Sequence, residues 1–311
     1  MIQHPAWGVI EEKIGGRLDY DVPMKEHTTF GVGGPARVLA RPETVEELTE
    51  IIIACRCIGL PYYILGAGSN ILFLDNGFDG VVIKLGRNFR GMEYQGGGII
   101  VAGAAAPVGL LLEMALDLEL GGLECLAGIP GTLGGAIRMN AGSFGATIGP
   151  LVDRVRYVEG QGQPGDIPGS GLKFSYRSVQ GLPEAAVIVG AELKLGPGQG
   201  PALRATVQER LNQRAERHPK GARCAGSIFK NPPEIPAGKL IEECGFKGVV
   251  RGGAKVSEMH ANFIINPESR AKSSDILELM REIIDSVRQV HGLTLEPEIK
   301  IVGSEGETRL R

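Results

Sequence analysis

The sequence predicts an α+β fold divided into more than one domain. Its 311 residues exceed the roughly 100–200 residues of a typical domain. Short apolar runs bounded by Gly, Asn or Asp are typical of strands, a few amphipathic segments are typical of helices, and the 47 glycines indicate many turns. After His218 and Pro219 the pattern changes to a compact alternation of helical and extended segments, which predicts a domain boundary near residue 219.

The helical period is clearest in two segments. Thr44 and Glu47 have capping-box spacing ahead of an apolar stripe, which predicts a helix that ends near Gly59. Towards the C-terminus, apolar residues recur at intervals of three and four until Gly292 ends the pattern. This predicts a buried stripe of Ile276, Met280, Ile283, Val287 and Val290 on a helix over residues 274–291. Further helices are expected at residues 107–121, 201–217 and 239–244.

The extended segments are short and follow one another closely. They are expected at residues 62–65, 71–74, 81–85, 99–101, 152–158, 172–176, 186–195, 261–265 and 294–302. Residues 161–171 are typical of a polar turn region. The glycine-dense stretch 123–149 keeps Leu, Ile, Met and Phe throughout, so it is expected to be a buried loop that shapes a ligand site.

Charge and hydropathy exclude two classes of partner. The formal net charge is −3 and the basic residues are scattered, so the concentrated positive face that nucleic acid requires is not expected. No stretch approaches the roughly 20 apolar residues that span a bilayer. Residues 1–12 lack the pattern of a signal peptide, and a cytoplasmic protein without membrane contact is therefore expected.

The cysteines and histidines show no metal-ligand spacing. The five cysteines include one C-x-C pair, Cys55 and Cys57, inside an apolar helical pattern with no second ligand pair nearby. The five histidines do not form an H-E-x-x-H motif, and no G-x-S-x-G elbow is present. Buried free thiols are expected, a metal site is not, and neither zinc nor serine hydrolase chemistry has support.

The first of three glycine-rich segments matches a dinucleotide fingerprint only formally. Residues 31–36 fit the pattern G-x-G-x-x-A. A Rossmann fingerprint follows a strand and opens a helix, whereas here Pro35 interrupts and residues 37–41 look extended. A Rossmann site is therefore rejected.

The other two glycine segments are open to two interpretations each. Residues 65–70 (LGAGSN) lie between two strand-like runs, where backbone N–H groups either converge on a phosphate or turn the chain tightly. Residues 128–135 (GIPGTLGG), with Asn140 to Gly142 behind them, form a glycine-lined stretch against which a flat ring or a diphosphate could lie.

Three polar residues are candidates for chemistry, each with a plain structural alternative. Arg177 ends a short strand and could hold a carboxylate through two hydrogen bonds, or it is a surface charge. Ser227 stands among small residues with a lysine and an amide close behind, or it is a turn residue. Glu298 shares one strand face with Glu296 by alternation, which could equally be a solvated acidic edge.

Taken in order, these segments resemble the UDP-N-acetylenolpyruvoylglucosamine reductases (the MurB family), from about residue 27 to residue 303. The motifs that carry the resemblance are HTTFGVGGPA at 27–36, LGAGSN at 65–70, AGIPGTLGGA at 127–136, MNAG at 139–142, FSYRS at 174–178, GSIFKNP at 226–232 and LEPE at 295–298. The last three are specific to that reductase, whereas the glycine segments are shared with a wider superfamily of FAD-dependent oxidases.

The resemblance implies a fold and a cofactor. It implies an α+β architecture with a two-part FAD-binding region of the PCMH or vanillyl-alcohol-oxidase type, at residues 1–85 and 86–218, and a small C-terminal α/β substrate domain at residues 219–311. FAD would be held by Gly66, Ala67, Gly68, Ser69, Asn70, Ile129, Gly131, Thr132, Gly134, Gly135, Ala141 and Gly142. No histidine or cysteine stands where a covalent flavin link is expected, so the FAD should be dissociable.

The resemblance also implies a reaction in peptidoglycan precursor synthesis. NADPH reduces the flavin and leaves, and the enolpyruvyl ether of UDP-N-acetylglucosamine then takes hydride from flavin N5 at C3. Arg177 would polarise the substrate and stabilise the developing charge. Ser227 would donate a proton to C2, and Glu298 would assist charge stabilisation or proton supply.

The substrate-binding residues and two departures follow from the same resemblance. Arg223, Lys230 and Asn231 would lie near the diphosphate of the sugar nucleotide, and a monomer is expected. The chain resembles the subtype without a tyrosine-bearing clamp loop, so Arg223 or Lys230 would have to cover the diphosphate. Many relatives have glutamine at the position of Lys255, where the lysine either contacts substrate or is solvated.

Two other functions remain open from the sequence. A flavin oxidase acting on a sugar alcohol or lactone would use the glycine segments equally well, but it leaves Arg177, Ser227 and Glu298 unexplained. A non-catalytic FAD or sugar-nucleotide binding module of the same fold is disfavoured because all three residues are intact.

Overall fold

The computed structural model describes residues 4–219 and 221–310. The chain forms two compact units, each assembled from separate stretches. Unit 1 comprises Met1–Asp19, Leu39–Ala67 and Val82–Arg214, and unit 2 comprises Tyr20–Val38, Gly68–Val81 and Ala215–Arg311. Two short N-terminal stretches therefore belong with the C-terminal third of the sequence.

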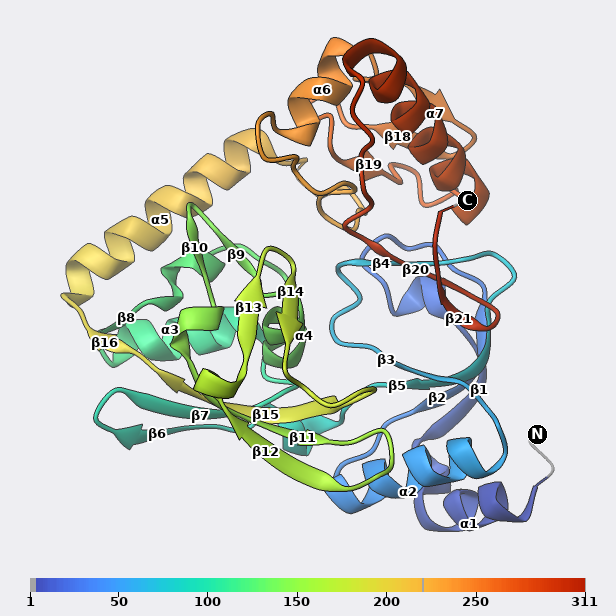
Figure 1. The fold of residues 1–311 in the computed structure, drawn as a ribbon, viewed down its shortest axis with the longest axis vertical. Helices are drawn as coiled ribbons and strands as arrows, with labels where there is room; N and C mark the ends of the chain where they lie inside the picture. Colours follow the sequence, from blue (N-terminus) through green and yellow to red (C-terminus); the bar gives the residue numbers. More distant parts are fainter. Residues whose placement is uncertain (1–3, 220, 311) are drawn as a thin grey trace. The chain divides into compact units, whose positions relative to one another are not determined.

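A five-stranded antiparallel sheet is the centre of unit 1 (Figure 1). Its strand order is β12-β11-β15-β7-β6. Helix α4 (Leu133–Arg138) packs on β15 and β7. The strands are β6 (Met92–Gly96), β7 (Ile99–Gly103), β11 (Val152–Val158), β12 (Pro164–Pro168) and β15 (Val187–Lys194). The pairing of β11 with β15 shifts register at two points, and buried and exposed residues on β11 therefore do not simply alternate.

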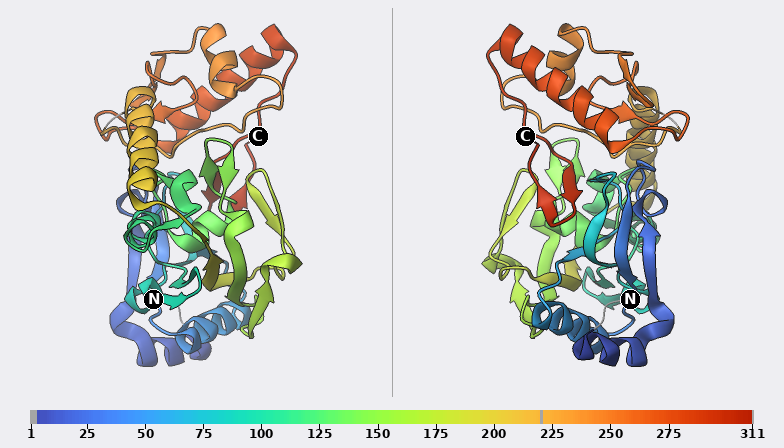
Figure 2. Two further views of the ribbon diagram at one scale, coloured as in Figure 1. Left: turned by 90° about the vertical axis from the view of Figure 1, so that its left-hand side faces the viewer. Right: turned by 90° about the vertical axis from the view of Figure 1, so that its right-hand side faces the viewer.

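Two helices of unit 1 lie side by side, as both views in Figure 2 show in blue. They are α1 (Pro5–Ile14) and α2 (Val45–Cys57). Each buries an apolar stripe, which includes Trp7 and Ile10 on α1 and Leu48 and Ile52 on α2. Removing these stripes from water is the main term that holds the two helices together.

The remaining elements include a second sheet, two helices and several short strands. A four-stranded sheet has the order β1-β2-β5-β3, with β1 (Leu18–Pro23), β2 (Pro35–Ala40), β5 (Phe78–Ile83) and β3 (Tyr62–Ile64). The others are α3 (Val108–Asp117), β8 (Leu120–Gly121), β9 (Gly142–Ser143), β10 (Ala146–Thr147), β13 (Lys173–Ser175), β14 (Ser178–Gln180), β16 (Gly196–Pro197) and α5 (Gly200–Arg217).

Unit 2 is built around one long amphipathic helix, α7 (Ser273–His291). A core of fully buried residues joins α7 to α6 (Ala237–Glu243) and to residues from the two N-terminal stretches, among them Phe30 and Leu72. Its strands are β4 (Ile71–Phe73), β17 (Val250–Arg251), β18 (Ala254–Val256), β19 (Ile264–Ile265), β20 (Lys300–Gly303) and β21 (Gly306–Thr308). Strand β20 pairs in parallel with β4 and antiparallel with β21.

The start of α7 is capped by a residue from far away in the sequence. The Asp75 carboxylate accepts from the backbone N–H groups of Ser273 (2.8 Å) and Ser274 (3.2 Å), and the Asp75 N–H donates to Ser273 Oγ (2.8 Å). Asp275 Oδ2 accepts from the Lys272 N–H at 2.9 Å. Backbone donors that a helix leaves unpaired are thus satisfied by one remote and one local carboxylate.

The structure confirms most of the predicted elements and corrects several. Of the predicted stripe on α7, Ile276, Met280, Ile283 and Val287 are buried, but Val290 is 61% exposed because it lies in the last turn, beyond the core. The expected loop at 123–149 contains α4, and the expected turn region at 161–171 contains β12, which pairs with β11 as a hairpin.

Two further expectations need correction in detail. The extended segment expected at 294–302 is regular only over β20, and the one at 261–265 only over β19.

All five cysteines are free, but Cys57 is exposed whereas Cys55 is buried. Residues two positions apart on a helix point about 200° apart around its axis, so the thiols of Cys55 and Cys57 cannot both lie on the buried face.

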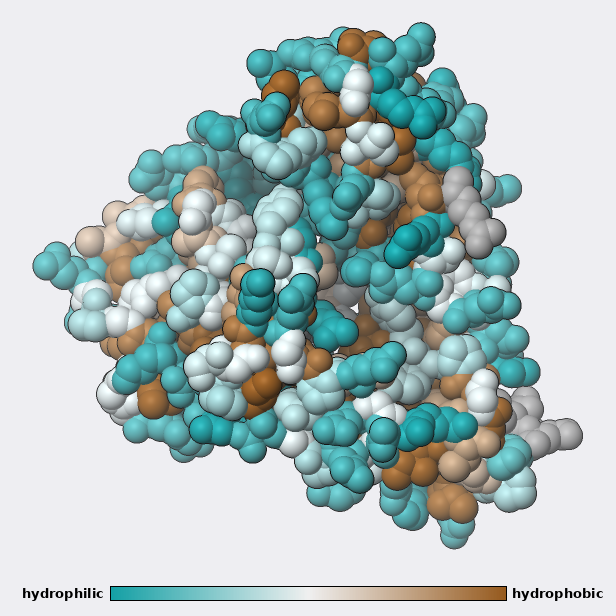
Figure 3. Space-filling view, in the orientation of Figure 1, coloured by the Kyte–Doolittle hydropathy of each residue, from teal (hydrophilic) through white to brown (hydrophobic). Residues whose placement is uncertain are grey.

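The surface shows no membrane-spanning element within the described residues. Hydrophilic residues and apolar patches intermingle on the face drawn in Figure 3. None of the helices described between residues 4 and 310 is both long and apolar enough to cross a bilayer.

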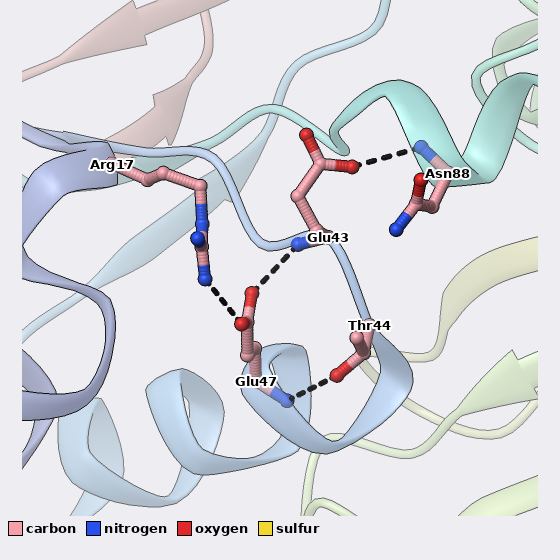
Figure 4. Close-up of polar contacts among 5 residues, drawn as sticks. All are labelled: Arg17, Glu43, Thr44, Glu47 and Asn88. Carbon is pink, nitrogen blue, oxygen red and sulfur yellow. Dashed lines mark hydrogen bonds and ion pairs between the residues drawn. The ribbon is translucent and has the colours of Figure 1, made fainter.

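A carboxylate network at the start of α2 ties three segments of unit 1 together (Figure 4). Thr44 Oγ1 accepts from the Glu47 N–H, as the sequence predicts, but the Glu47 carboxylate accepts from the Glu43 N–H (2.8 Å) and from Arg17, where a capping box would use the Thr44 N–H. Glu43 Oε2 in turn accepts from the Asn88 N–H at 2.8 Å, and this bond lowers the pKa of Glu43.

Replacing Glu47 with alanine is expected to lower the free energy of unfolding by about 1–3 kcal/mol, the range for hydrogen bonds to a charged group. The change removes the acceptor shared by Arg17 and Glu43. Urea unfolding at pH 7 measures the loss. Glu50, also on α2, pairs with Lys13 at the surface, so Glu50→Ala should cost less than about 1 kcal/mol. Equal losses in the two variants would contradict a specific contribution from the network.

Candidate active site

The second glycine segment is closely packed on both sides of Ala67. In unit 1, a Cβ at Gly66 would lie 2.8 Å from Thr132 Oγ1, so this segment touches the third glycine segment. In unit 2, Gly68 has φ +69°, and a Cβ there would lie 2.2 Å from the His27 carbonyl oxygen. Glycine is required at Gly68 by both conformation and space.

At two glycines of the third segment, Gly131 and Gly135, neither backbone conformation nor lack of space requires a glycine. No positive φ occurs at Gly131 or Gly135. A Cβ at Gly131 would have Val108 Cγ2 as its nearest neighbour, at 4.0 Å, and one at Gly135 would meet only Thr132 Oγ1, at 3.5 Å. Since backbone conformation and packing both permit a side chain, the bare surface at Gly131 and Gly135 fits a flat group lying against it.

Arg177 occupies a tight turn that Asn140, a few residues after the third glycine segment, supports. The turn joins β13 to β14, and Arg177 has φ +56°. Asn140, itself buried with φ +42°, donates from Nδ2 to the Ser175 carbonyl (2.9 Å) and accepts at Oδ1 from the Gly149 N–H (3.0 Å). The Arg177 guanidinium lies 5.0 Å from the centre of the Tyr176 ring.

A second guanidinium approaches this part of unit 1. Arg214 on α5 donates from Nε to the Ala127 carbonyl at 3.0 Å, and its side chain covers Gly128. Burial lowers the pKa of Arg214, and the neighbouring Arg177 charge lowers it further. Two cations that repel each other beside a glycine-lined surface favour an anionic ligand there.

Ser227 and Glu298 lie in unit 2 on two chain segments that pair with each other. The Glu298 N–H donates to the Ile228 carbonyl (2.7 Å), and the Lys230 N–H donates to the Glu296 carbonyl (2.9 Å). Ser227 therefore directly precedes a residue whose carbonyl is bonded to Glu298. Neither residue belongs to a regular strand, since the two segments share only an isolated bridge between Phe229 and Pro297.

The second glycine segment joins this pair through hydrogen bonds within unit 2. Asn70 donates from Nδ2 to the Glu298 carbonyl at 3.3 Å. Thr29, in the 27–36 motif just ahead of the first glycine segment, donates from Oγ1 to the Cys224 carbonyl at 2.6 Å, and its N–H donates to the Gly68 carbonyl at 3.0 Å. Four of the sequence motifs thus meet in unit 2.

The candidate substrate-binding residues all have protein partners. Arg223 is exposed, and its side chain covers Gly31. Lys230 pairs with Glu296 (3.1 Å), and Asn231 Oδ1 accepts from the Ala237 N–H (3.0 Å) at the start of α6. Lys255, for which the sequence left two interpretations, pairs with Glu258 at 2.6 Å.

Sequence reasoning missed Thr29, Asn140 and Arg214 as supports of the site. Each acts through bonds to backbone carbonyls that are distant in sequence, and such bonds leave no spacing pattern. No cluster of His, Cys, Asp and Glu suited to a metal ion occurs among residues 4–219 and 221–310.

Two family models match the chain. The model described as UDP-N-acetylenolpyruvoylglucosamine reductase, C-terminal domain, matches residues 218–302. The model described as FAD binding domain matches residues 36–163. The matched ranges include the second and third glycine segments in the FAD-binding match and Ser227 and Glu298 in the C-terminal match.

Full-length relatives carry the same name as the C-terminal model. The chain is 38% identical over 297 residues to a UDP-N-acetylenolpyruvoylglucosamine reductase of Syntrophus aciditrophicus, with 94% of each chain covered. It is 41% identical over 298 residues to one of Desulfosudis oleivorans, covering 92% of this chain and 95% of the relative.

Solved structures agree on the fold. The crystal structure of the Thermus caldophilus UDP-N-acetylenolpyruvylglucosamine reductase matches with a TM-score of 0.79 and 36% identity, over 90% of this chain and 97% of that one. Phl p 4, a grass pollen allergen with glucose dehydrogenase activity, matches with a TM-score of 0.51 over 93% of this chain and 63% of its own, but at 13% identity it shows the fold alone. The predicted α+β fold with an FAD-binding region is confirmed.

Proposed function

Because the chain belongs to the UDP-N-acetylenolpyruvoylglucosamine reductase family, we propose that it uses NADPH to reduce the enolpyruvyl ether of UDP-N-acetylglucosamine to UDP-N-acetylmuramate, in peptidoglycan precursor synthesis. The observation that carries the proposal is the pairing of the Ser227 and Glu298 segments through the bond from the Glu298 N–H to the Ile228 carbonyl. An oxidase of the same superfamily needs the glycine segments but has no use for this pair.

FAD is the cofactor that the glycine segments fit. Gly66 to Asn70 and Ile129 to Gly135, with Ala141 and Gly142, would hold it without a covalent link. The bare surface at Gly131 and Gly135 is the feature that a flat ring explains. Bound FAD supplies the relay of hydride from NADPH to C3 of the enolpyruvyl group.

The chain's own groups prepare the substrate for that hydride. An enol ether is electron-rich, so its carboxylate must be polarised and the charge that develops at C2 must be stabilised. Arg177 offers two parallel N–H donors for the carboxylate, in a turn fixed by Asn140. Arg214 adds a second positive charge near Arg177, and burial strengthens the attraction of that charge for the substrate carboxylate.

Protonation at C2 completes the reaction. Ser227 is the donor in this proposal: a hydroxyl has a high pKa, but a strongly basic carbon beside it makes the transfer downhill, and proximity supplies much of the rate. Glu298 stabilises charge or resupplies the proton. The Ile228 carbonyl, bonded to the Glu298 N–H, keeps the two segments in a fixed register.

The sugar nucleotide is proposed to bind residues of the C-terminal domain, 219–311. Arg223, Lys230 and Asn231 would approach the diphosphate. For Lys230 this requires exchange of its ion pair with Glu296, at 38% and 73% side-chain exposure, which costs little in solvent. We also propose that the protein works in the cytoplasm as a monomer.

The test is to reduce the flavin of the purified protein anaerobically with NADPH and to record flavin absorbance as the enolpyruvyl sugar is added. Reoxidation by that sugar is the expected result. A reduced flavin that reacts only with oxygen would instead support the oxidase alternative, and a protein that binds no flavin would overturn the role of the glycine segments.

Replacing Gly131 with leucine is expected to weaken FAD binding at least tenfold, since the new side chain would occupy the proposed ring surface. The apoprotein should melt within a few degrees of the parent, because nothing lies closer than 4.0 Å to the new Cβ. Quenching of FAD fluorescence measures the affinity. Gly109 on α3 also has open space around its Cβ, so Gly109→Leu is the matched control and should bind FAD normally. Unchanged affinity in Gly131→Leu would remove this surface from the proposed site.

A further inference from the structure

Residue Asn262 lies beside the Ser227 segment and is almost completely buried, at 2% exposure. Its side chain makes a paired contact with one residue: Oδ1 accepts from the Phe229 N–H at 2.9 Å, and Nδ2 donates to the Phe229 carbonyl at 2.8 Å. Its main-chain carbonyl accepts from the Ile228 N–H at 2.9 Å. Asn262 thus replaces a neighbouring strand for the two residues that follow Ser227.

Hydrogen bonds from two sides fix this short stretch. Residues 296–298 bond to the Ile228 carbonyl and to the Lys230 N–H. Asn262 bonds to the Ile228 N–H and to both polar backbone groups of Phe229. Ile228 and Phe229 are at most 1% exposed, so water cannot replace a lost partner, and an unpaired polar group there is costly.

Asn262 is itself held in place. Its N–H donates to His260 Nδ1 at 3.2 Å, which requires that nitrogen to be unprotonated. Burial lowers the pKa of His260 and Lys247 lowers it further, while Glu242 acts in the opposite direction. The His260 ring packs against His218 and Phe263. The amide therefore has a fixed position from which to hold the Ser227 segment.

We propose that Asn262 is a positioning residue that sets the register of Ser227 against Glu298. Ile228 is the link, because its N–H bonds to Asn262 and its carbonyl accepts from the Glu298 N–H. Ser227 lies outside any regular strand, so these bonds replace a sheet in fixing its hydroxyl. The inference rests on the proposed role of Ser227 as proton donor.

The test separates the two halves of the reaction in Asn262→Ser and Asn262→Ala. Flavin reduction by NADPH, which needs no proton from Ser227, should stay within about threefold of the parent. Reoxidation by the enolpyruvyl sugar should fall on the order of 100-fold, the effect of misplacing a reacting group by about 1 Å. The solvent deuterium isotope effect on reoxidation should rise, because proton transfer becomes slower.

A matched control and a measurement on the unmodified protein make the test decisive. Ser273→Ala removes another buried polar side chain of unit 2, bonded to the Asp75 N–H, and should leave the ratio of the two half-reactions unchanged. In the parent protein, the Phe229 amide should be strongly protected from hydrogen exchange. Fast exchange of that amide, or equal slowing of both half-reactions in the Asn262 variants, would overturn the proposal. If Ser227→Ala reoxidises as fast as the parent, the proposed role of Ser227 fails, whereas protection at Phe229 would be unaffected.

Discussion

Replacing Ser227 with alanine is expected to slow reoxidation of the flavin by the enolpyruvyl sugar by about 10³-fold, within the 10²–10⁴ range for a general acid. The substitution removes one hydroxyl, and the backbone hydrogen bonds of this segment are made by Ile228, Phe229 and Lys230. The fold and the FAD content should therefore be unchanged. Stopped-flow absorbance with NADPH-reduced enzyme measures the step directly. Reduction by NADPH should proceed at the parent rate.

A second serine in unit 2 serves as the control for Ser227→Ala. Ser274 lies at the start of α7, where its backbone N–H and not its hydroxyl bonds to Asp75. Ser274→Ala should therefore leave both half-reactions unchanged. If Ser227→Ala retained reoxidation within about threefold of the parent, Glu298 or water would have to supply the proton.

Replacing Arg177 with lysine is expected to lower kcat/KM for the enolpyruvyl sugar by about 10²–10³-fold, the cost of losing an electrostatic donor to the transition state. Lysine keeps the charge but cannot offer two parallel N–H groups to a carboxylate. Both residues have the same backbone requirement at φ +56°, so the turn should persist. Steady-state kinetics with varied sugar concentration separate the effect on kcat from that on KM.

The control for Arg177→Lys is a surface arginine of the same unit. Arg154 on β11 pairs with Asp166 at the surface, so Arg154→Lys should leave kcat/KM unchanged. A similar kcat/KM in Arg177→Lys and the parent would mean that charge alone suffices, and Arg214 would then become the candidate for holding the carboxylate.

Periodicity predicted three of the amphipathic helices, and tertiary pairing decided other elements. Helices α2, α3 and α7 follow from apolar spacing and from capping or terminating residues. The charged helix α5 was expected without such a stripe, and α1 was not predicted. Strand β12 was not predictable in this way, because its polar sequence becomes extended only by pairing with β11. Similarly, Val290 continues a stripe on α7 that the core no longer reaches.

The residues of the candidate site fall into the same two groups, those in local sequence motifs and those placed by tertiary contacts. Ser227, Glu298 and Arg177 stand in local motifs, and the structure describes a backbone link between the Ser227 and Glu298 segments. Asn262 and Arg214 are distant in sequence from the groups that they hold, since the bonded partners are 33 and 87 positions apart. A single sequence gives no sign of such bonds, because any buried amide or half-buried arginine would look the same.

The parallel pairing of β20 with β4 has a consequence for protein synthesis. Unit 2 needs Asp75, 198 residues before its partner Ser273, and its strands β20 and β21 leave the ribosome after the other described helices and strands of the unit. Until residues 300–308 emerge, β4 lacks this partner strand and the core around Leu72 stays partly open. A nascent chain stalled before residue 300 should therefore present an exposed apolar surface to chaperones, whereas the sheet of unit 1, complete by residue 194, can already have formed.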